Sequence, residues 1–260
     1  VRVSELTQNQ LIQLQKKTVK TLALGQALGG FGLGATLSVG ALMAVELSGT
    51  PAWSGAAATL STLGSAASAI PLANLAYRSG RRIALGFGAA LAILGALGMI
   101  LAAFTRSFPI ELVALFLLGA GSAVGLQARF AAADIPTGQP KGKDLSLVVW
   151  ATTLGAVIGP NLIAPGEQLG LWLGMPHLSG PFIFTVAAQL SSTLVFWFGL
   201  RPDPLLIAKE VAGLPARRKN PGVAVALDVI RSYPLAGFAV LTIALSHMVM
   251  VSVMSMTPAH

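Results

Sequence analysis

The sequence predicts an all-α polytopic membrane protein, and its charge distribution carries that prediction. Long segments contain no Lys, Arg, Asp or Glu: residues 21–45, 47–77, 83–105, 112–128, 145–166, 168–200 and 232–260. A helix needs roughly 20 mostly apolar residues to cross the hydrocarbon layer, and a backbone in lipid must satisfy its own hydrogen bonds. The runs are continuously apolar rather than alternating, which excludes barrel strands. We therefore expect about seven membrane-spanning helices.

The overall composition points the same way. Mean hydropathy is +0.75 and only 10% of residues are charged, whereas soluble domains carry about 25%. The net charge of +8 could suggest nucleic acid, but the basic residues lie at the ends of apolar runs rather than on one face. The expected partner is therefore the lipid bilayer, with no nucleic acid. Without cysteine there is no disulfide or thiolate metal site, and neither metal nor cofactor is expected.

Basic residues are confined almost entirely to one set of alternate connections. Sixteen of the 17 Lys and Arg residues fall in that set, and the opposite loops hold only Arg106, together with Glu46, Glu111 and Glu167. Cytoplasmic loops are enriched in Lys and Arg. This asymmetry predicts a cytoplasmic N-terminus, and we expect the plasma (inner) membrane as the location.

The first two hundred residues divide into a polar segment and six expected spans. Residues 1–20 should form a cytoplasmic amphipathic segment at the membrane surface, with Leu11 and Leu14 toward lipid. Pro51 suits the first turn of a helix. A tight loop at 77–82, an outer loop at 105–109 and a Pro- and Gly-rich inner loop at 134–144 separate later spans. The six spans of the N-domain, residues 21–200, are expected at about 21–46, 51–76, 83–104, 109–132, 145–165 and 178–200.

The remaining residues predict a linker and one further helix. Residues 201–231 hold four prolines and nine charged residues, which indicates a cytoplasmic inter-domain linker, with a short helix near Leu205–Ala212. Residues 232–260 supply a seventh span, expected to be the first helix of an incomplete C-domain. The sequence thus has the layout of the first half of a larger protein plus the opening helix of its second half.

Residues 73–82 carry the first motif, Ala-Asn-Leu-Ala-Tyr-Arg-Ser-Gly-Arg-Arg. Gly80 permits the positive φ of a tight turn, and arginines at helix ends can bind free carbonyls or carboxylates. The segment resembles the major facilitator superfamily signature Gly-x-Leu-Ala-Asp-Arg-x-Gly-Arg-Arg. Arg78, Gly80, Arg81 and Arg82 match that pattern, whereas Tyr77 replaces its Asp. A simple positive-inside anchor is the alternative interpretation.

The fifth apolar run carries the second motif. Gly155, Gly159 and Pro160 match the superfamily's fifth-helix antiporter motif, Gly-x-x-x-Gly-Pro-x-x-Gly-Gly, and the pair Pro165-Gly166 stands two positions beyond its final Gly-Gly. Glycines four residues apart leave one helix face bare for close packing, and Pro160 removes a helical hydrogen bond and bends the span. The alternative is a generic kinked packing helix.

The resemblance implies a secondary transporter of small organic molecules that works by alternating access and consists of two six-helix halves. It implies the drug-efflux type, with efflux coupled to proton antiport, and a C-terminal half not contained in this sequence. A truncated or non-transporting membrane module, such as a half-transporter or a binding or scaffold protein, is the alternative. An enzyme is not expected, because the sequence has no His-Glu-x-x-His, no Gly-x-Ser-x-Gly and no paired aspartates in adjacent spans.

Asp134 and Arg129, near the end of span four, are candidates for a functional role. The resemblance pairs a carboxylate at this end of the helix with an arginine of the preceding loop, which corresponds here to Asp134 with Arg78 or Arg81. Arg129 lies inside the span, where arginine indicates function by default. It could join a structural or gating ion pair, contact substrate, or extend its side chain to the interface.

Further polar residues within the spans are candidates for a substrate cavity: Gln26, Gln127, Arg129, Asn161 and His247. His247 is the only titratable group well inside an unambiguous span, and a neutral core histidine is its alternative. No Asp or Glu is expected deep in a span, so the sequence predicts no obvious proton carrier. The cavity composition favours an amphipathic or apolar organic substrate.

Overall fold

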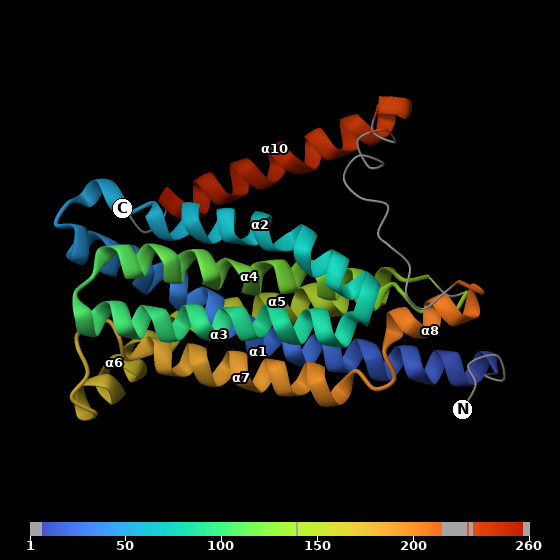
Figure 1. Ribbon diagram of the computed structural model, residues 1–260, viewed down its shortest axis with the longest axis horizontal. Helices are drawn as coiled ribbons and strands as arrows, with labels where there is room; N and C mark the ends of the chain where they lie inside the picture. Colours follow the sequence, from blue (N-terminus) through green and yellow to red (C-terminus); the bar gives the residue numbers. More distant parts are fainter. Residues whose placement is uncertain (1–6, 139, 215–227, 229–230, 257–260) are drawn as a thin grey trace. The chain divides into compact units, whose positions relative to one another are not determined.

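The computed structural model describes residues 7–138, 140–214, 228 and 231–256, with the backbone alone at 33, 35–37, 156, 234, 247 and 250–256. It divides into two compact units, residues 1–218 and 219–260. In the first unit, long helices run side by side (Figure 1). The elements are α1 (Gln8–Ser48), the 3₁₀ turn η2 (Pro51–Trp53), α2 (Ala56–Ser79), α3 (Arg81–Thr105), α4 (Phe108–Ala132), α5 (Gly142–Asn161), α6 (Ile163–Trp172), α7 (Pro181–Gly199) and α8 (Pro204–Val211). The second unit contains α10 (Pro234–Met256).

Small residues set the packing order in the first unit. α4 lies between α2 and α3, while α1 packs mainly against α5 and α7. A Cβ placed on Gly64 of α2 would lie 1.8 Å from the Phe116 carbonyl oxygen of α4, and one on Gly119 would lie 2.1 Å from the Ser61 carbonyl oxygen. Only glycine allows the two backbones to approach this closely. The crossing of α2 and α4 is therefore fixed by this pair.

The bundle is apolar on its outer surface as well as inside. On α3, the side chains of Phe87, Leu94 and Leu101 are each about half exposed, at 52%, 56% and 52%. The opposite face of α3 buries small residues such as Ala92 and Ala96. Soluble helices carry charge on their exposed face, whereas a helix in lipid presents large apolar side chains there. This pattern is that of an all-α polytopic membrane protein, as the sequence predicted.

Fewer spans meet a length-and-composition criterion than the sequence predicted. Among the described residues, four segments are long and apolar enough to cross a membrane: Pro51–Ser79, Arg81–Thr105, Phe108–Ala132 and Pro181–Val211. α5 and α6 add a fifth if this pair, bent by 50°, counts as one span. The other two expected spans fall on α1 and α10, whose side chains are described only in part. The number seven stays a prediction.

Several predicted boundaries are wrong. Residues 8–20 are not a separate surface helix but the first turns of the 41-residue α1. Leu11 and Leu14 do not face lipid, since they pack with Ile135 and Ile207. The expected loop at 77–82 shrinks to Gly80 alone, because its flanking residues are helical. The expected fifth span ends early, at Asn161, two residues after Gly159. Charged residues and prolines indicate where a helix reaches water or bends, but the helix does not have to end at them.

Candidate functional site

The connection between α2 and α3 is a one-residue turn at Gly80. Its φ of +96° lies in the region that favours glycine, and its N–H donates to the Ala76 carbonyl over 2.8 Å. A Cβ here would also lie 2.4 Å from Oδ2 of Asp203. Glycine is thus required both by the backbone and by the carboxylate packed on it. We call the end of the bundle that holds Gly80, loop 133–141 and α8 the basic end.

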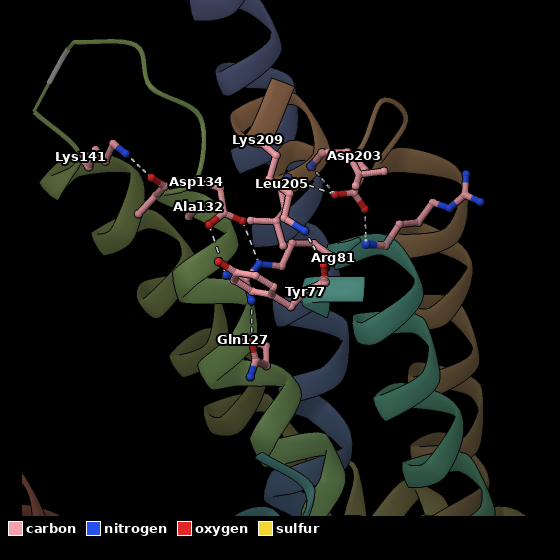
Figure 2. Close-up of polar contacts among 12 residues, drawn as sticks. Tyr77, Arg81, Gln127, Ala132, Asp134, Lys141, Asp203, Leu205 and Lys209 are labelled. Atoms are coloured by element: carbon pink, nitrogen blue, oxygen red, sulfur yellow. Dashed lines mark hydrogen bonds and ion pairs between the residues drawn. The ribbon is translucent and has the colours of Figure 1, made fainter. Parts of the chain in front are cut away.

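Arg81 opens α3 and joins it to α4 (Figure 2). Its Nε lies 2.8 Å from Oδ2 of Asp134 and its Nη2 lies 3.2 Å from Oδ1, a two-point ion pair in which each side chain is 12% exposed. The Nη1 atom donates to Oε1 of Gln127 over 2.6 Å. The Gln127 amide in turn donates to the Ala69 carbonyl of α2 over 3.4 Å. The Arg81 guanidinium therefore joins α3 to α4, and the Gln127 amide extends the connection to α2.

The other two arginines of the motif have different surroundings. Arg78 is exposed, so Asp134 pairs with Arg81 rather than with Arg78. The Arg82 guanidinium lies 5.1 Å from the ring centre of Trp197 on α7, a distance suited to a cation–π contact. The motif arginines thus contact two neighbouring helices, α4 and α7, and among the described residues only Arg81 of the three forms an ion pair.

The Asp203 carboxylate accepts hydrogen bonds from the N-termini of two helices, α8 and α3. One carboxylate oxygen, Oδ1, accepts from the backbone N–H groups of Leu205 and Leu206 at 3.0 and 3.3 Å and so caps α8. The other, Oδ2, accepts from the backbone N–H of Arg82 at 2.8 Å in the first turn of α3. A carboxylate satisfies otherwise unpaired N–H groups at such ends. This single side chain fixes α8 against the α2–α3 turn.

Lys209 is a second contact between α8 and the α2–α3 turn. Its side chain is only 5% exposed; Nζ donates to the Tyr77 carbonyl and lies 4.4 Å from the centre of the Tyr77 ring. Tyr77 stands where the superfamily pattern has Asp. The Tyr77 ring thus provides an aromatic face against which the Lys209 ammonium group lies.

The first turns of α1 close the basic end from the other side. Nε2 of Gln15 donates to the Ala132 carbonyl and to Oδ2 of Asp144, both at 2.6 Å. Nε2 of Gln8 donates to the Thr137 carbonyl over 3.0 Å. Loop 133–141 is thereby fixed to α1, which explains why residues 8–20 stay helical and packed instead of lying on the membrane surface.

The span-five motif lies where α5 meets α1. A Cβ on Gly155 would lie 2.2 Å from the Ala27 carbonyl oxygen, so the two helices touch backbone to backbone. Gly159 is buried one turn further on, while Pro160 is exposed. The helix ends at Asn161 and resumes at Ile163 after the 50° bend. Pro160 lacks the N–H that would bond residue 156, which accounts for a break at this point.

The predicted cavity residues, where they are described, make different contacts. Gln26 is buried, and its Oε1 accepts from the Thr152 hydroxyl of α5 at 3.2 Å. Gln127 belongs to the Arg81 network instead. Arg129 is half-buried, and its Nε has no hydrogen-bond partner among the described residues. Asn161 is exposed and bonds the Val157 carbonyl of its own helix, while the His247 side chain lies outside the described residues.

The opposite end of the bundle carries a second group of titratable residues. His177 lies 3.8 Å from an oxygen of Glu46 and 3.5 Å from one of Glu167, and Glu167 also accepts from the Leu178 N–H at 3.0 and 3.1 Å. The charge pattern predicts Glu111 in a loop at this end. That placement is wrong, since Glu111 is fully buried in the first turn of α4.

Sequence reasoning missed Asp203, Lys209, Gln15 and the burial of Glu111. One signal was available for Asp203, because Asp followed directly by Pro204 is the pattern of an N-cap before a first-turn proline. Nothing in the local sequence distinguishes Lys209 or Gln15 from other solvated polar residues. Their roles depend on contacts with residues more than a hundred positions away.

The fold and the basic-end network define a class, that of polytopic helical membrane proteins with a small-residue core and an arginine-rich turn between the second and third helices. Comparison with known families makes the assignment: residues 22–260 match the Major Facilitator Superfamily. The chain belongs to this family and is an integral membrane protein, as the two motifs indicated.

Three relatives illustrate the match. The uncharacterized MFS-type transporters YdeG and YddS of Bacillus subtilis are each 37% identical to this chain, over 247 and 252 residues, covering 95% of it and 57% of each relative. The riboflavin transporter RfnT of Brucella anthropi is 32% identical over 150 residues, which is 57% of this chain and 37% of that protein. The chain thus spans a little more than half the length of the first two relatives.

Proposed function

We propose that the chain forms the N-terminal part of a secondary active transporter that moves small organic molecules by alternating access. In this proposal residues 21–200 form the N-domain, 201–231 the linker and 232–260 the start of a second domain. A second six-helix half completes the substrate cavity. Family membership and the coverage of about half of YdeG and YddS support this division.

The observation that carries the proposal is the polar network at the basic end. Alternating access requires one end of the bundle to close while the other opens. Arg81, Asp134 and Gln127 join three helices through hydrogen bonds rather than apolar packing. Such contacts can be exchanged for water without exposing apolar surface, so they suit a closure that forms and breaks repeatedly. We assign the Arg81–Asp134 pair the role of a gate element.

The orientation follows from charge. The basic end holds α8, loop 133–141 and the motif arginines, whereas the opposite end holds Glu46, Glu111 and Glu167. Because Lys and Arg are concentrated on the cytoplasmic side of membrane proteins, we place the basic end and the N-terminus in the cytoplasm, and the protein in the plasma (inner) membrane.

For the substrate we propose an amphipathic or apolar organic molecule, exported in exchange for protons. Besides the Gln15–Asp144 contact at the basic end, α1 and α5 share a polar contact between two neutral groups, the Gln26 amide and the Thr152 hydroxyl. Such groups orient a substrate by hydrogen bonds without demanding a counter-charge. The name of RfnT makes riboflavin one reasonable probe, and the efflux hypothesis makes the cationic dye ethidium a second.

The test uses the full-length transporter in inside-out membrane vesicles. Acidifying the vesicle lumen should drive uptake of riboflavin or ethidium, and a protonophore should abolish it. Vesicles that carry Asp134→Asn serve as the comparison and should take up the probe several-fold more slowly. Uptake that survives the protonophore would contradict proton antiport but not transport. Failure of both probes in correctly folded protein would favour the non-transporting module instead.

A further inference from the structure

Glu111 is an acidic side chain with no partner. It lies in the first turn of α4 at the end opposite the basic end, and its side chain is 0% exposed. Neither Oε1 nor Oε2 has a hydrogen-bond partner among the described residues. Buried carboxylates in proteins are ordinarily paired or hydrogen-bonded, because a stranded charge is costly. The surroundings of Glu111 therefore require an explanation.

The neighbourhood of Glu111 is apolar. Residues three and four positions on, Ala114 and Leu115, share its helix face and are buried in a cluster with Met99 of α3 and Phe182 of α7. The positive end of the α4 dipole favours a carboxylate only modestly, by less than the cost of desolvating a full charge. Neither the packing nor the helix end supports an ionised side chain here.

The charged groups at this end are engaged elsewhere or exposed. Of the helices packed on α4, α1 contributes Glu46, whose carboxylate lies near His177. α3 contributes Arg106, which is exposed at the helix end. α2 and α5 contribute none at this end, and Glu167 on α6 bonds His177 and the Leu178 N–H. Within the described part of the chain, none of them forms an ion pair with Glu111.

From this geometry we propose that Glu111 is a proton-binding site. Buried as it is here, the side chain holds its proton as a neutral carboxylic acid. When this end opens, water reaches the group, the O–H bond breaks, the proton passes to a water molecule, and the hydrated carboxylate remains. The site itself does not depend on transport, whereas its use for proton coupling rests on the proposed function above.

Infrared spectroscopy of the purified chain in lipid tests the site directly. At neutral pH the wild-type protein should show the carbonyl stretching band of a protonated carboxylic acid. Glu111→Gln should lose this band, while Glu210→Gln, a matched change at an exposed residue of α8, should keep it. Absence of the band in the wild type, or its persistence in Glu111→Gln, would overturn the proposal.

A second measurement needs no variant, in case Glu111→Gln fails to fold. Dicyclohexylcarbodiimide is an apolar reagent that converts protonated carboxyl groups within a membrane into N-acylureas. Mass spectrometry of the treated wild type should find the adduct on Glu111, and a water-soluble carbodiimide should modify Glu210 but not Glu111. Modification of Glu111 by the water-soluble reagent alone would show an ionisable group in contact with water, contrary to the proposal.

Transport assays distinguish proton binding by Glu111 from a role of Glu111 in proton coupling. In the full-length protein, Glu111→Gln should abolish proton-driven probe accumulation and retain exchange of labelled for unlabelled probe, which needs no net proton movement. Unchanged proton-driven accumulation would exclude a coupling role. A wild type that transports neither riboflavin nor ethidium would contradict the proposed function, and the spectroscopic result on Glu111 would be unaffected.

Discussion

At the residue scale, the Asp134 carboxylate has one strong partner and a defined neighbourhood. Arg81 satisfies both of its oxygens, and the same guanidinium also reaches Gln127. Resemblance to a family pattern was enough to predict an Asp134 pair with Arg78 or Arg81, since the motif places both arginines nearby. It could not choose between them. That choice depends on which arginine points inward once Gly80 reverses the chain, and this is a property of the folded turn.

The first prediction concerns this pair. Asp134→Asn and Arg81→Gln should each lower the free energy of unfolding by about 1–3 kcal/mol, because the remaining group is left unsatisfied. In the double variant no charge is stranded, so its loss should be smaller than the sum of the single losses. Thermal unfolding of all four proteins in the same lipid measures the coupling. Strictly additive losses would show that the two side chains act independently.

The second prediction distinguishes two reasons why residue 80 must be glycine, its positive φ and the Asp203 carboxylate packed on it. Gly49→Ala tests backbone strain alone, because Gly49 also has a positive φ of +71° but nothing lies within 4 Å of its added Cβ. It should cost about 1 kcal/mol, the penalty for a left-handed residue with a side chain. Gly80→Ala must in addition displace Asp203, and should therefore cost more and release α8.

Limited proteolysis can detect the release of α8. Cleavage between α7 and the end of α8 should accelerate in Gly80→Ala and in Asp203→Ala, while Gly49→Ala should be cut at the wild-type rate. Equal protection in all four proteins would mean that Asp203 does not hold α8 in place.

At the element scale, the sequence predicted which segments are helical but not where they end. Apolar runs identified α2, α3, α4 and α7 because continuous hydrophobicity is a property of the segment itself. The ends depend on contacts elsewhere. The cluster of lysines at 16, 17 and 20 indicated the boundary of a span, yet α1 continues through it. Gln15 bonds the end of α4 and the start of α5, and Leu11 packs against Ile135 and Ile207.

The third prediction tests the contact between α1 and α5. Gly155→Val should prevent the two backbones from meeting, since even a Cβ would lie 2.2 Å from the Ala27 carbonyl oxygen. A dense interior cannot absorb that displacement, so we expect loss of folded protein or a drop of several kcal/mol in stability. Gly142→Ala, on the same helix with nothing within 4 Å of its added Cβ, is the control. Size-exclusion chromatography and thermal unfolding compare the two variants, and equal stability would disprove the close contact.

At the scale of the whole molecule, the proposed orientation gives a direct labelling experiment. These 260 residues contain no cysteine, so single cysteines introduced into them are labelled without background from this part of the chain. Pro136→Cys and Glu210→Cys lie at exposed positions of the basic end, and Thr50→Cys lies at an exposed position of the opposite end. In intact cells an impermeant maleimide should modify only Thr50→Cys.

Permeabilised cells provide the control, because all three cysteines should then react. Modification of Pro136→Cys or Glu210→Cys in intact cells, with Thr50→Cys protected, would reverse the assigned orientation. Reaction of all three from outside would contradict the arrangement of the spans themselves.

The Asp203 bridge has a consequence for how the protein is made. Its partner, the Arg82 N–H, precedes it by 121 residues, so this bond closes a loop that contains α4, α5 and α7. During synthesis the start of the linker therefore has no docking surface until α2 and α3 are already inserted and turned at Gly80. We expect attachment of α8 to be a late event in biogenesis, one that marks a nascent chain whose helices α2 and α3 have already been assembled in the membrane.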